Sequence, residues 1–422
     1  MSSNTGKRND WLAAIDEAID ERFARMTEVR RWLHAHPEPS GHETETARFL
    51  EDLLVREGLQ PRAACDGRGL ICDGTDRTEV PMIALRADVD ALRIHDGKQV
   101  PYRSQNPGIM HACGHDAHSA ILFGTLSALR HLENSGRLSW PIRYRAIFQP
   151  AEETCEGALQ MIAAGALEGV SAIVALHVDP TREVGHIGIR TGVLTANCDE
   201  MRIVVQGRGG HAARPHETSD PIAAAAQLIN ALYLHIPRVT DSQEAVVVTV
   251  GQVHGGDNAN VIPEEVELRG TIRSLDRTVR QHTMDHVRRL AFGVGQTTLT
   301  KIQVDFGLGC HSVCNDAAIA ELLRSSGKQV LGHAAVSEIA RPSMGSEDFA
   351  FYLDRVPGAM MRLGCASHRS GRASLHTPNF DIDEEALRIG AKVMAQAAVR
   401  WCNPDLPAVS RPQGESPEAG DS

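Results

Sequence analysis

The sequence lacks the features that would direct it to a nucleic acid or a membrane. Its 43 Lys and Arg are outnumbered by 54 Asp and Glu, which leaves a formal net charge of −11. Such a charge opposes any partner held mainly through phosphates, so we expect no nucleic-acid partner. The longest apolar-leaning stretch, 222–236, contains polar residues and is shorter than the roughly 20 residues that span a bilayer. We therefore expect no membrane partner.

The cysteines lack the regular spacing of a disulfide framework. Nine of them are scattered through the 422 residues, an odd number with no repeated interval. This usage favours a reducing compartment. Residues 1–23 also lack the uninterrupted apolar core of a secretory signal, because charged residues recur every few positions. The sequence predicts a soluble, cytoplasmic protein.

What is present is the composition of an ordinary globular protein, with 42% hydrophobic and 23% charged residues. At roughly 150 residues per domain, the chain is long enough for two or three domains. Apolar runs at 82–85, 142–148 and 172–176 predict strands, and helical patterns at 119–132 and 157–167 separate them. This alternation predicts the α/β class, with a central mixed sheet covered by helices.

A second unit interrupts this pattern. Strand-like runs at 201–205, 245–253, 266–272 and 302–306 alternate with helical patterns at 221–234 and 278–291. The resulting βαββαβ order is typical of a ferredoxin-like domain.

We therefore predict four parts of the chain. They are the first part of a catalytic domain at 1–191, an inserted lid or dimerisation domain at 192–306, the second part of the catalytic domain at 307–402, and a disordered tail at 403–422. The tail is rich in Pro, Ser, Gly and acidic residues.

Potential metal ligands follow the predicted strands of the first domain. Glu152 and Glu153 follow the second strand and His177 follows the third, while Cys113 and His115 precede the helix at 119–132. Ligands of an open α/β sheet bind beyond the carboxyl ends of its strands. Alone, each residue is more commonly a core histidine, a buried thiol or a solvated acid. Their joint placement favours a metal site, with zinc the commonest ion for such ligands.

Several motifs together resemble one family. They are RRWLHAHPEPS, ALRADVDAL, MHACGHDAHSA, IFQPAEE, GRGGHAARPH, NANVIPEEVELRGTIRSLD, MGSEDFAFYL and LHTPNFDIDEEAL, spread over residues 30–400. The sequence resembles the dinuclear metal-dependent aminoacylase and carboxypeptidase superfamily, in the branch that contains hippurate hydrolase and the auxin-conjugate (indoleacetyl-amino acid) amidohydrolases. Pro39, Arg93 and Val193 depart from the family pattern, and Arg93 near the cleft bears on substrate choice.

The resemblance implies two divalent metal ions per subunit, zinc or manganese, with cobalt or nickel as further candidates. The implied ligands are the bridging Cys113, with Glu153 and His376 for one ion and His115 and His177 for the other. Glu152 is then the general base. Asp88 and Asp116 are expected to orient a histidine ligand from behind.

The resemblance also assigns the substrate contacts. His211 of the small domain, often from the partner subunit, would stabilise the oxyanion of the intermediate. Asn260 and Arg273 would hold the substrate carboxylate, and Gly345 would bring backbone N–H groups close. These roles imply a homodimer or a dimer of dimers.

The expected activity is hydrolysis of the amide bond of an N-acyl amino acid through a metal-activated water. A dipeptidase or carboxypeptidase acting at the same site is the alternative enzyme. A non-catalytic, metal-dependent binder of amino-acid conjugates is a further alternative, against which Glu152 argues because binding needs no proton shuttle. A redox role for Cys113 lacks a nearby resolving cysteine, Cys155 being the closest in sequence.

Overall fold

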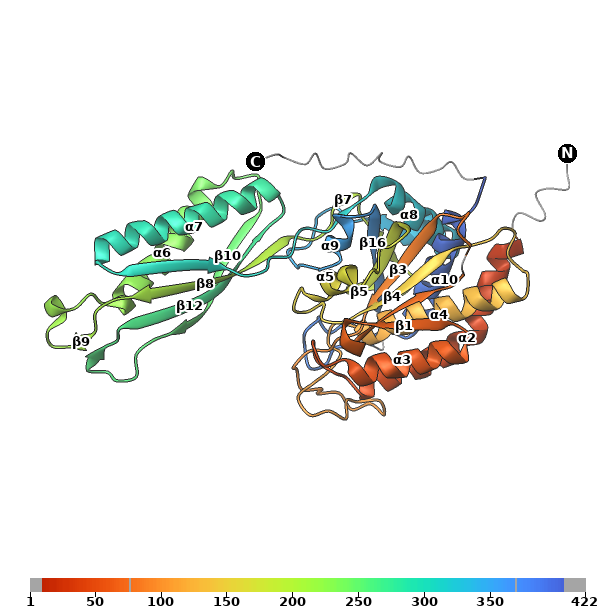
Figure 1. The fold of residues 1–422 in the computed structure, drawn as a ribbon, viewed down its shortest axis with the longest axis horizontal. Coiled ribbons are helices and arrows are strands. Elements are labelled where there is room, and N and C mark those ends of the chain that lie inside the picture. The colour runs from red at the N-terminus through yellow and green to blue at the C-terminus, as the bar shows by residue number, and fades with distance from the viewer. Residues whose placement is uncertain (1–9, 76, 369, 406–422) are drawn as a thin grey trace.

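The large domain is built on a mixed eight-stranded sheet with the strand order β1-β2-β4-β3-β5-β16-β6-β15 (Figure 1). The computed structural model describes residues 10–75, 77–368 and 370–405. The strands of this sheet are β1 (Gln60–Ala64), β2 (Gly69–Asp73), β3 (Met82–Asp88), β4 (Tyr144–Gln149), β5 (Val170–Glu183), β6 (Ile187–Ile189), β15 (Val336–Glu338) and β16 (Gly358–Ala366).

The centre of the sheet is parallel, which decides where the loops of interest lie. β3 pairs in parallel with both β4 and β5, and β5 pairs in parallel with β16. Asp88 at the end of β3 is level with Gln149 at the end of β4. The segments after β3, β4 and β5 therefore leave the sheet at one edge, as expected for consecutive parallel strands.

Helices cover both faces of this sheet. One face packs against α2 (Asp10–Ala35), α4 (His115–Asn134) and α10 (Glu385–Trp401) in a single apolar cluster. The other face packs against α5 (Gly157–Ala163) and α9 (Ala350–Leu353). The remaining large-domain helices are α3 (Thr44–Arg56) and α8 (Ala317–Leu331). The predicted α/β class is confirmed.

The small domain, residues 197–306, has its own sheet of β8 (Asn197–Gln206), β10 (Val246–His254), β12 (Glu265–Ser274) and β13 (Lys301–Phe306). The strand order is β10-β12-β8-β13, and every pair is antiparallel. Helices α6 (Pro221–Val239) and α7 (Arg277–Thr298) pack on one face of it. Figure 1 shows this domain extending away from the large one, as an inserted ferredoxin-like unit does.

Helix α6 begins where the sequence predicts but ends later than predicted. Asp220 caps its first turn by accepting hydrogen bonds from Ile222 N and Ala223 N. The predicted end at Leu234 is wrong, because α6 continues through Pro237 to Val239. Ile236 is buried in the small-domain core, and this packing holds the last turn in place despite the proline.

Short elements escaped the sequence analysis. The antiparallel β1–β2 pair and the short strands β6 and β15 widen the sheet on both sides of the predicted strands. They contain five or fewer residues each, too few for a periodic pattern to stand out. Of the predicted tail at 403–422, residues 406–422 lie outside the described part of the chain. Within the described residues, no helix is long and apolar enough to cross a membrane.

A buried arginine ties α2 to the rest of the large domain. The Arg30 guanidinium donates to Asp116 at 2.9 Å, to Asp381 at 2.5 Å and to Glu384 at 3.2 Å. Its side chain is 1% exposed, whereas the side chain of the adjacent Arg31, which also binds Glu384, is 48% exposed. Removing one partner from a buried ionic network leaves the other charges without compensation.

We therefore expect Arg30→Met to lower the free energy of unfolding by about 3–5 kcal/mol. The matched variant Arg31→Met should lower it by less than about 1 kcal/mol, because solvent screens an exposed pair. Urea unfolding of the two variants and the wild type measures the difference. Equal losses in both variants would contradict a special role for the buried network.

Candidate metal centre

The side chains singled out as metal ligands converge at the carboxyl edge of the parallel strands. Cys113 lies in the loop before α4, and His115 is the first residue of that helix. His177 lies on β5, and Glu153 lies in the turn that follows β4. His376 comes from the loop between β16 and α10, where its backbone N–H donates to Ala112 O at 2.8 Å.

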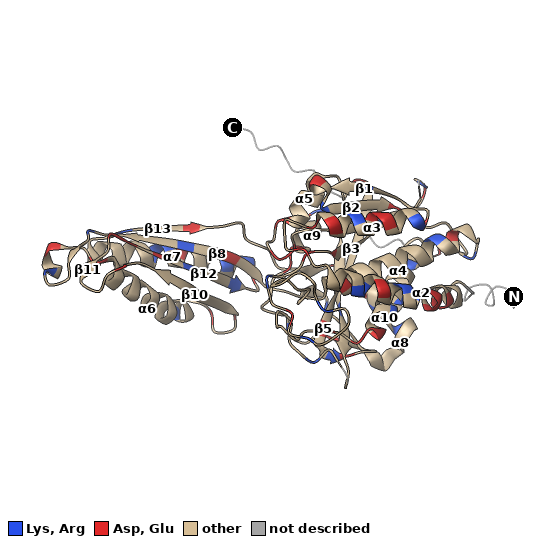
Figure 2. Cartoon of the chain, turned by 90° about the horizontal axis from the view of Figure 1, so that it is seen from below, with Lys and Arg blue, Asp and Glu red and all other residues tan. Residues whose placement is uncertain are grey.

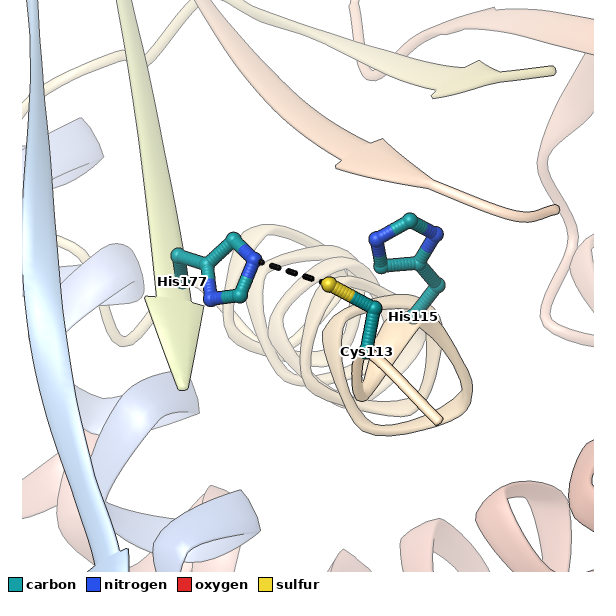
Figure 3. A group of neighbouring side chains, drawn as sticks. All are labelled: Cys113, His115 and His177. Atoms are coloured by element: carbon teal, nitrogen blue, oxygen red, sulfur yellow. Dashed lines mark hydrogen bonds between the residues drawn. The ribbon is translucent and has the colours of Figure 1, made fainter. Parts of the chain in front are cut away.

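Cys113 is the centre of this group. Its Sγ lies 3.4 Å from His177 Nε2 and 3.3 Å from His376 Nε2. These histidines are 64 and 263 positions away in sequence. Figure 3 shows the thiol between the His177 and His115 rings. A sulfur and a nitrogen that bind one zinc ion tetrahedrally lie about 3.5 Å apart, so both separations fit a shared ion.

The chemistry of the donor set also fits metal ions. Ligand atoms of Cys113, His115 and His177 lie within 4.8 Å of one another, and so do those of Cys113, Glu153 and His376. His115 Nε2 and Glu153 Oε1 are buried without a hydrogen-bond partner among the described residues. Buried polar atoms normally have a partner. Two overlapping groups that share one thiol could hold two divalent ions.

Asp90, rather than Asp116, lies behind the histidine ligand. His115 Nδ1 lies 3.1 Å from Asp90 Oδ1 and 2.9 Å from Asp90 O. Asp90 Oδ2 accepts from the backbone N–H of Glu153 at 3.0 Å, so this carboxylate contacts two potential ligands. The prediction that Asp116 orients a histidine ligand is wrong in this structure. Asp116 instead binds Arg30 and His34, which is not one of the potential metal ligands.

Asp88 also departs from its expected place. Its Oδ1 lies 2.6 Å from His118 Nδ1 and 3.8 Å from the free Nε2 of His115. It therefore lies on the metal-facing side of His115 rather than behind the ring. His118, in turn, accepts from Val178 N at 3.0 Å and has a structural role.

The backbone around the centre is held in uncommon conformations. Ala151, Cys155 and His376 all have positive φ, between 52° and 60°. Gly114, with φ 92°, separates the two donors Cys113 and His115, and a Cβ at this position would lie 2.4 Å from the Val178 side chain. Such strain clusters at functional sites because the surrounding structure must maintain it.

Burial dominates the electrostatics of these groups. It raises the pKa of the Cys113 thiol to about 12 and the pKa of Glu153 to about 7. It lowers the pKa of His177, and the positive charge of Arg362 lowers it further. The neutral imidazole is the form that binds a metal, whereas a metal bound through Cys113 must displace the thiol proton.

Glu152 lies beside the donor set without being its centre. Its Oε2 lies 3.9 Å from His115 Nε2, and its side chain is 9% exposed. Burial raises the pKa of Glu152 well above the usual value, and the negative charges of Glu347, Glu153 and Asp348 add to this effect. A carboxyl group with a raised pKa is suited to exchanging protons near neutrality.

Sequence analysis missed the arginine that holds these acids in place. Arg86 on β3 is fully buried and donates to Asp88 at 2.5 Å and to Asp348 at 3.0 Å, with Glu347 also 3.0 Å away. Its Nε donates to Gln149 at 2.9 Å. The sequence offered one signal for this role. Arg86 is a charged residue near the end of an otherwise apolar strand, two positions before Asp88.

The residues expected to contact substrate are divided between the domains. His211 in β9 (Gly210–His211) and Asn260 lie on exposed segments joined through β11 (Val261–Ile262). Figure 1 shows β9 at the end of the small domain remote from the large one. Within one chain, the structure does not bring these two side chains to the donor set. Arg273, by contrast, reaches the large domain and donates to Met344 O at 2.8 Å, next to Gly345.

Comparisons with known proteins agree with this architecture. Residues 84–400 match the model of Peptidase family M20/M25/M40. The N-acetyl-L-cysteine deacetylase of Bacillus subtilis is 38% identical over 398 residues, covering 93% of this chain and 92% of that protein. IAA-amino acid hydrolase ILR1-like 4 of Arabidopsis thaliana is 34% identical over 403 residues, covering 94% and 87%.

A solved structure completes the comparison. The YXEP protein of Bacillus subtilis, described as a dinuclear metal binding peptidase from the M20 family, superposes with a TM-score of 0.76 at 33% identity. The match covers 91% of this chain and 99% of that one. The family match spans most of the chain, and the relatives include hydrolases of the predicted branch. The chain is therefore a hydrolase that belongs to Peptidase family M20/M25/M40.

Proposed function

We propose that this protein is a metal-dependent amidohydrolase that cleaves N-acyl amino acids into a carboxylic acid and an amino acid. The observation that carries the proposal is Glu152, a buried carboxyl group 3.9 Å from His115 at the edge of the donor set. The names of the relatives, a deacetylase of an N-acetyl amino acid and a hydrolase of amino-acid conjugates, support this substrate class. A carboxypeptidase is the second candidate, since relatives with that name are 34% identical.

The proposed centre holds two divalent ions, zinc or manganese, with cobalt or nickel as alternatives. Cys113 would bridge them, with His115 and His177 on one side and Glu153 and His376 on the other. The support is the pair of donor groups that share the Cys113 thiol. Ions bound there would supply Lewis acidity toward an amide carbonyl and increase the acidity of water.

Glu152 would move the protons of the reaction. It accepts a proton from the water that attacks the amide carbonyl, and it later donates that proton to the nitrogen of the leaving amine. Its raised pKa favours the first transfer, because a more basic carboxylate accepts a proton more readily. Arg86 keeps the neighbouring Glu347 and Asp348 in place through its two contacts of 3.0 Å.

Arg273 and Gly345 would bind the substrate carboxylate, together with Asn260 from the second chain of the dimer proposed below. Arg273 lies at the end of the small domain that faces the large one, with its guanidinium on the Met344 carbonyl. An arginine fork suits a carboxylate because it offers parallel donors. Asn260 precedes the short β11 strand that pairs with His211, so the two residues would reach a substrate together.

We further propose a homodimer, or a dimer of dimers, in which His211 completes the site of the partner. Within one chain His211 is exposed and far from the donor set. The small domain also exposes apolar side chains on α6 and on the edge strand β10, namely Ile222, Tyr233, Leu234, Val247 and Val253. Figure 2 shows α6 with little charge, which suits burial against a second copy.

A cytoplasmic location is supported by nine free cysteines.

Hydrolysis assays test the proposed activity. We expect the metal-loaded protein to hydrolyse acetyl-, benzoyl- or indoleacetyl-amino acids, to lose activity on chelation, and to regain it with zinc or manganese. A panel of dipeptides measured in parallel separates the aminoacylase from the peptidase. No turnover on either panel by the metal-loaded protein would contradict the proposed function.

Glu152→Gln should retain the metal ions and lower kcat by at least about 100-fold, because an amide cannot accept the proton. Metal analysis and steady-state kinetics on the same sample measure both properties. If metal content and kcat both stay at the wild-type level, Glu152 is not the general base.

Asp90→Asn should weaken metal binding roughly 10- to 100-fold, since Asp90 positions both His115 and Glu153. Asp116→Asn is the matched comparison, and it should reduce stability through Arg30 more than it reduces metal affinity. Titration of the metal-free proteins and urea unfolding give the two quantities. If Asp116→Asn weakened metal binding more than Asp90→Asn does, Asp116 and not Asp90 would orient the histidine ligand.

A complementation experiment tests the proposed dimer. His211→Ala and Glu152→Gln are each expected to be inactive alone. After mixing and reassociation, half of the dimers contain one chain of each kind, and one of their two sites is intact. About a quarter of the wild-type activity should therefore return. Demonstrated subunit exchange without recovered activity would show that His211 does not act across the interface.

A further inference from the structure

One guanidinium next to the proposed metal centre has no hydrogen-bond or ion-pair partner in the described part of the chain. Arg362 lies in the middle of β16, where it is the single residue of the strand that is not fully buried. Among the residues that the structure describes, no hydrogen bond or ion pair reaches its side chain. Arg145 and Arg190 of the large domain bind carboxylate or carbonyl oxygens, whereas the Arg400 guanidinium lies over the Trp11 ring.

The register of the sheet places Arg362 directly beside a donor of the centre. Arg362 is the parallel partner of His177 on β5, so the two side chains leave the sheet on the same face. Met360, two residues earlier on that face, belongs to the apolar cluster that includes Leu194 and Phe349. Leu194 O accepts from Ser343 N at 2.9 Å, which places the segment before Met344 and Gly345 over this face.

The acidic residue near Arg362, Asp179, already accepts hydrogen bonds from other side chains. On the other side of Arg362 the sheet continues with Gly188 of β6. The Arg182 guanidinium fills the space in front of Gly188, where a Cβ would lie 2.5 Å from it. Arg182 and Thr181 both donate to Asp179, the acidic residue two positions after His177. Arg362 is left as an uncompensated positive charge.

An unpaired guanidinium in this position is electrostatically unfavourable. It lies next to His177, one of the proposed metal ligands, which is its register partner on β5. A partly buried charge normally has a counter-ion. A negatively charged group of a bound substrate would supply such a counter-ion.

We propose that Arg362 binds a second carboxylate of the substrate, in addition to the α-carboxylate expected at Arg273. This inference rests on the proposed function and narrows its substrate class to N-acyl amino acids that carry two carboxylates. The second carboxylate has two possible sources, a dicarboxylic acyl group or an acidic amino-acid side chain. Both present the planar anion that a guanidinium fork binds.

The test compares matched substrates. N-succinyl-alanine and N-acetyl-glutamate each carry the second carboxylate, on the acyl group and on the side chain respectively. N-butyryl-alanine and N-acetyl-glutamine are their neutral counterparts. The wild type should have the higher kcat/KM for at least one dicarboxylate, and that substrate identifies the source.

Arg362→Met should lower kcat/KM for the preferred dicarboxylate roughly 10- to 100-fold, the usual effect of a lost charge-assisted contact. Activity on the neutral counterpart should change by less than about twofold. Arg324→Met is the control for the loss of one positive charge, because Arg324 on α8 is bound to Glu321 of the same helix and to Glu338 of β15. It should affect neither substrate.

Two results would overturn the proposal. An equal loss on all four substrates, accompanied by loss of metal, would show that Arg362 supports His177 instead. No loss on any substrate would show that water alone solvates it. If the wild type hydrolyses none of the four but hydrolyses other acyl-amino acids, the two-carboxylate substrate class is wrong and the proposed function stands.

A binding measurement tests the proposal if none of the four substrates is hydrolysed, and also if Arg362→Met does not fold. Calorimetric titration of the metal-loaded wild type with succinate and with butyrate compares a dicarboxylate with a monocarboxylate of similar length. Succinate should bind at least about tenfold more tightly. Equal affinities would contradict a second carboxylate site.

Discussion

The large domain depends on the convergence of buried polar side chains where its parallel strands end. One thiol, the imidazoles of His115 and His177 and several carboxylates are buried there, and two of their ligand atoms have no hydrogen-bond partner among the described residues. Buried charges are costly unless they are compensated. The rest of the domain can be understood as the framework that provides this compensation and fixes the geometry.

Two buried arginines provide much of that framework. Arg86 compensates Asp88, Glu347 and Asp348 from within the sheet. Arg30 compensates Asp116, the residue after His115, and connects it to α2 and to the segment before α10. Because guanidinium groups have several donors in a plane, each arginine can hold three carboxylates from two chain segments at once.

The division into two domains separates the chemistry from part of the substrate recognition. The donor set and Glu152 lie on the large domain, whereas His211 and Asn260 lie on the small one. Arg273 and Arg362 lie on either side of this division, near the Met344 segment and beside His177. In the proposed mechanism, a substrate is bound by charges at its ends while the amide bond lies at the metal centre between them.

The sequence by itself determined the class of the fold and most of the donor set. Apolar periodicity located the central strands and most helices, because burial of one face imposes that periodicity. The same reasoning missed β1, β2, β6 and β15, which are too short to carry a pattern. Cys113, His115, Glu153 and His177 could be found because each stands beside a recognisable strand or helix.

Only the tertiary structure decided how these side chains face one another. It placed Asp90 behind His115, turned Asp88 to the other side of that ring, and assigned Asp116 to Arg30. It also showed that Arg86 binds three carboxylates, and that Arg362 is the register partner of His177. The physical reason is that hydrogen bonds and charge compensation depend on distances of a few ångströms between residues far apart in sequence, and local patterns contain no information about those distances.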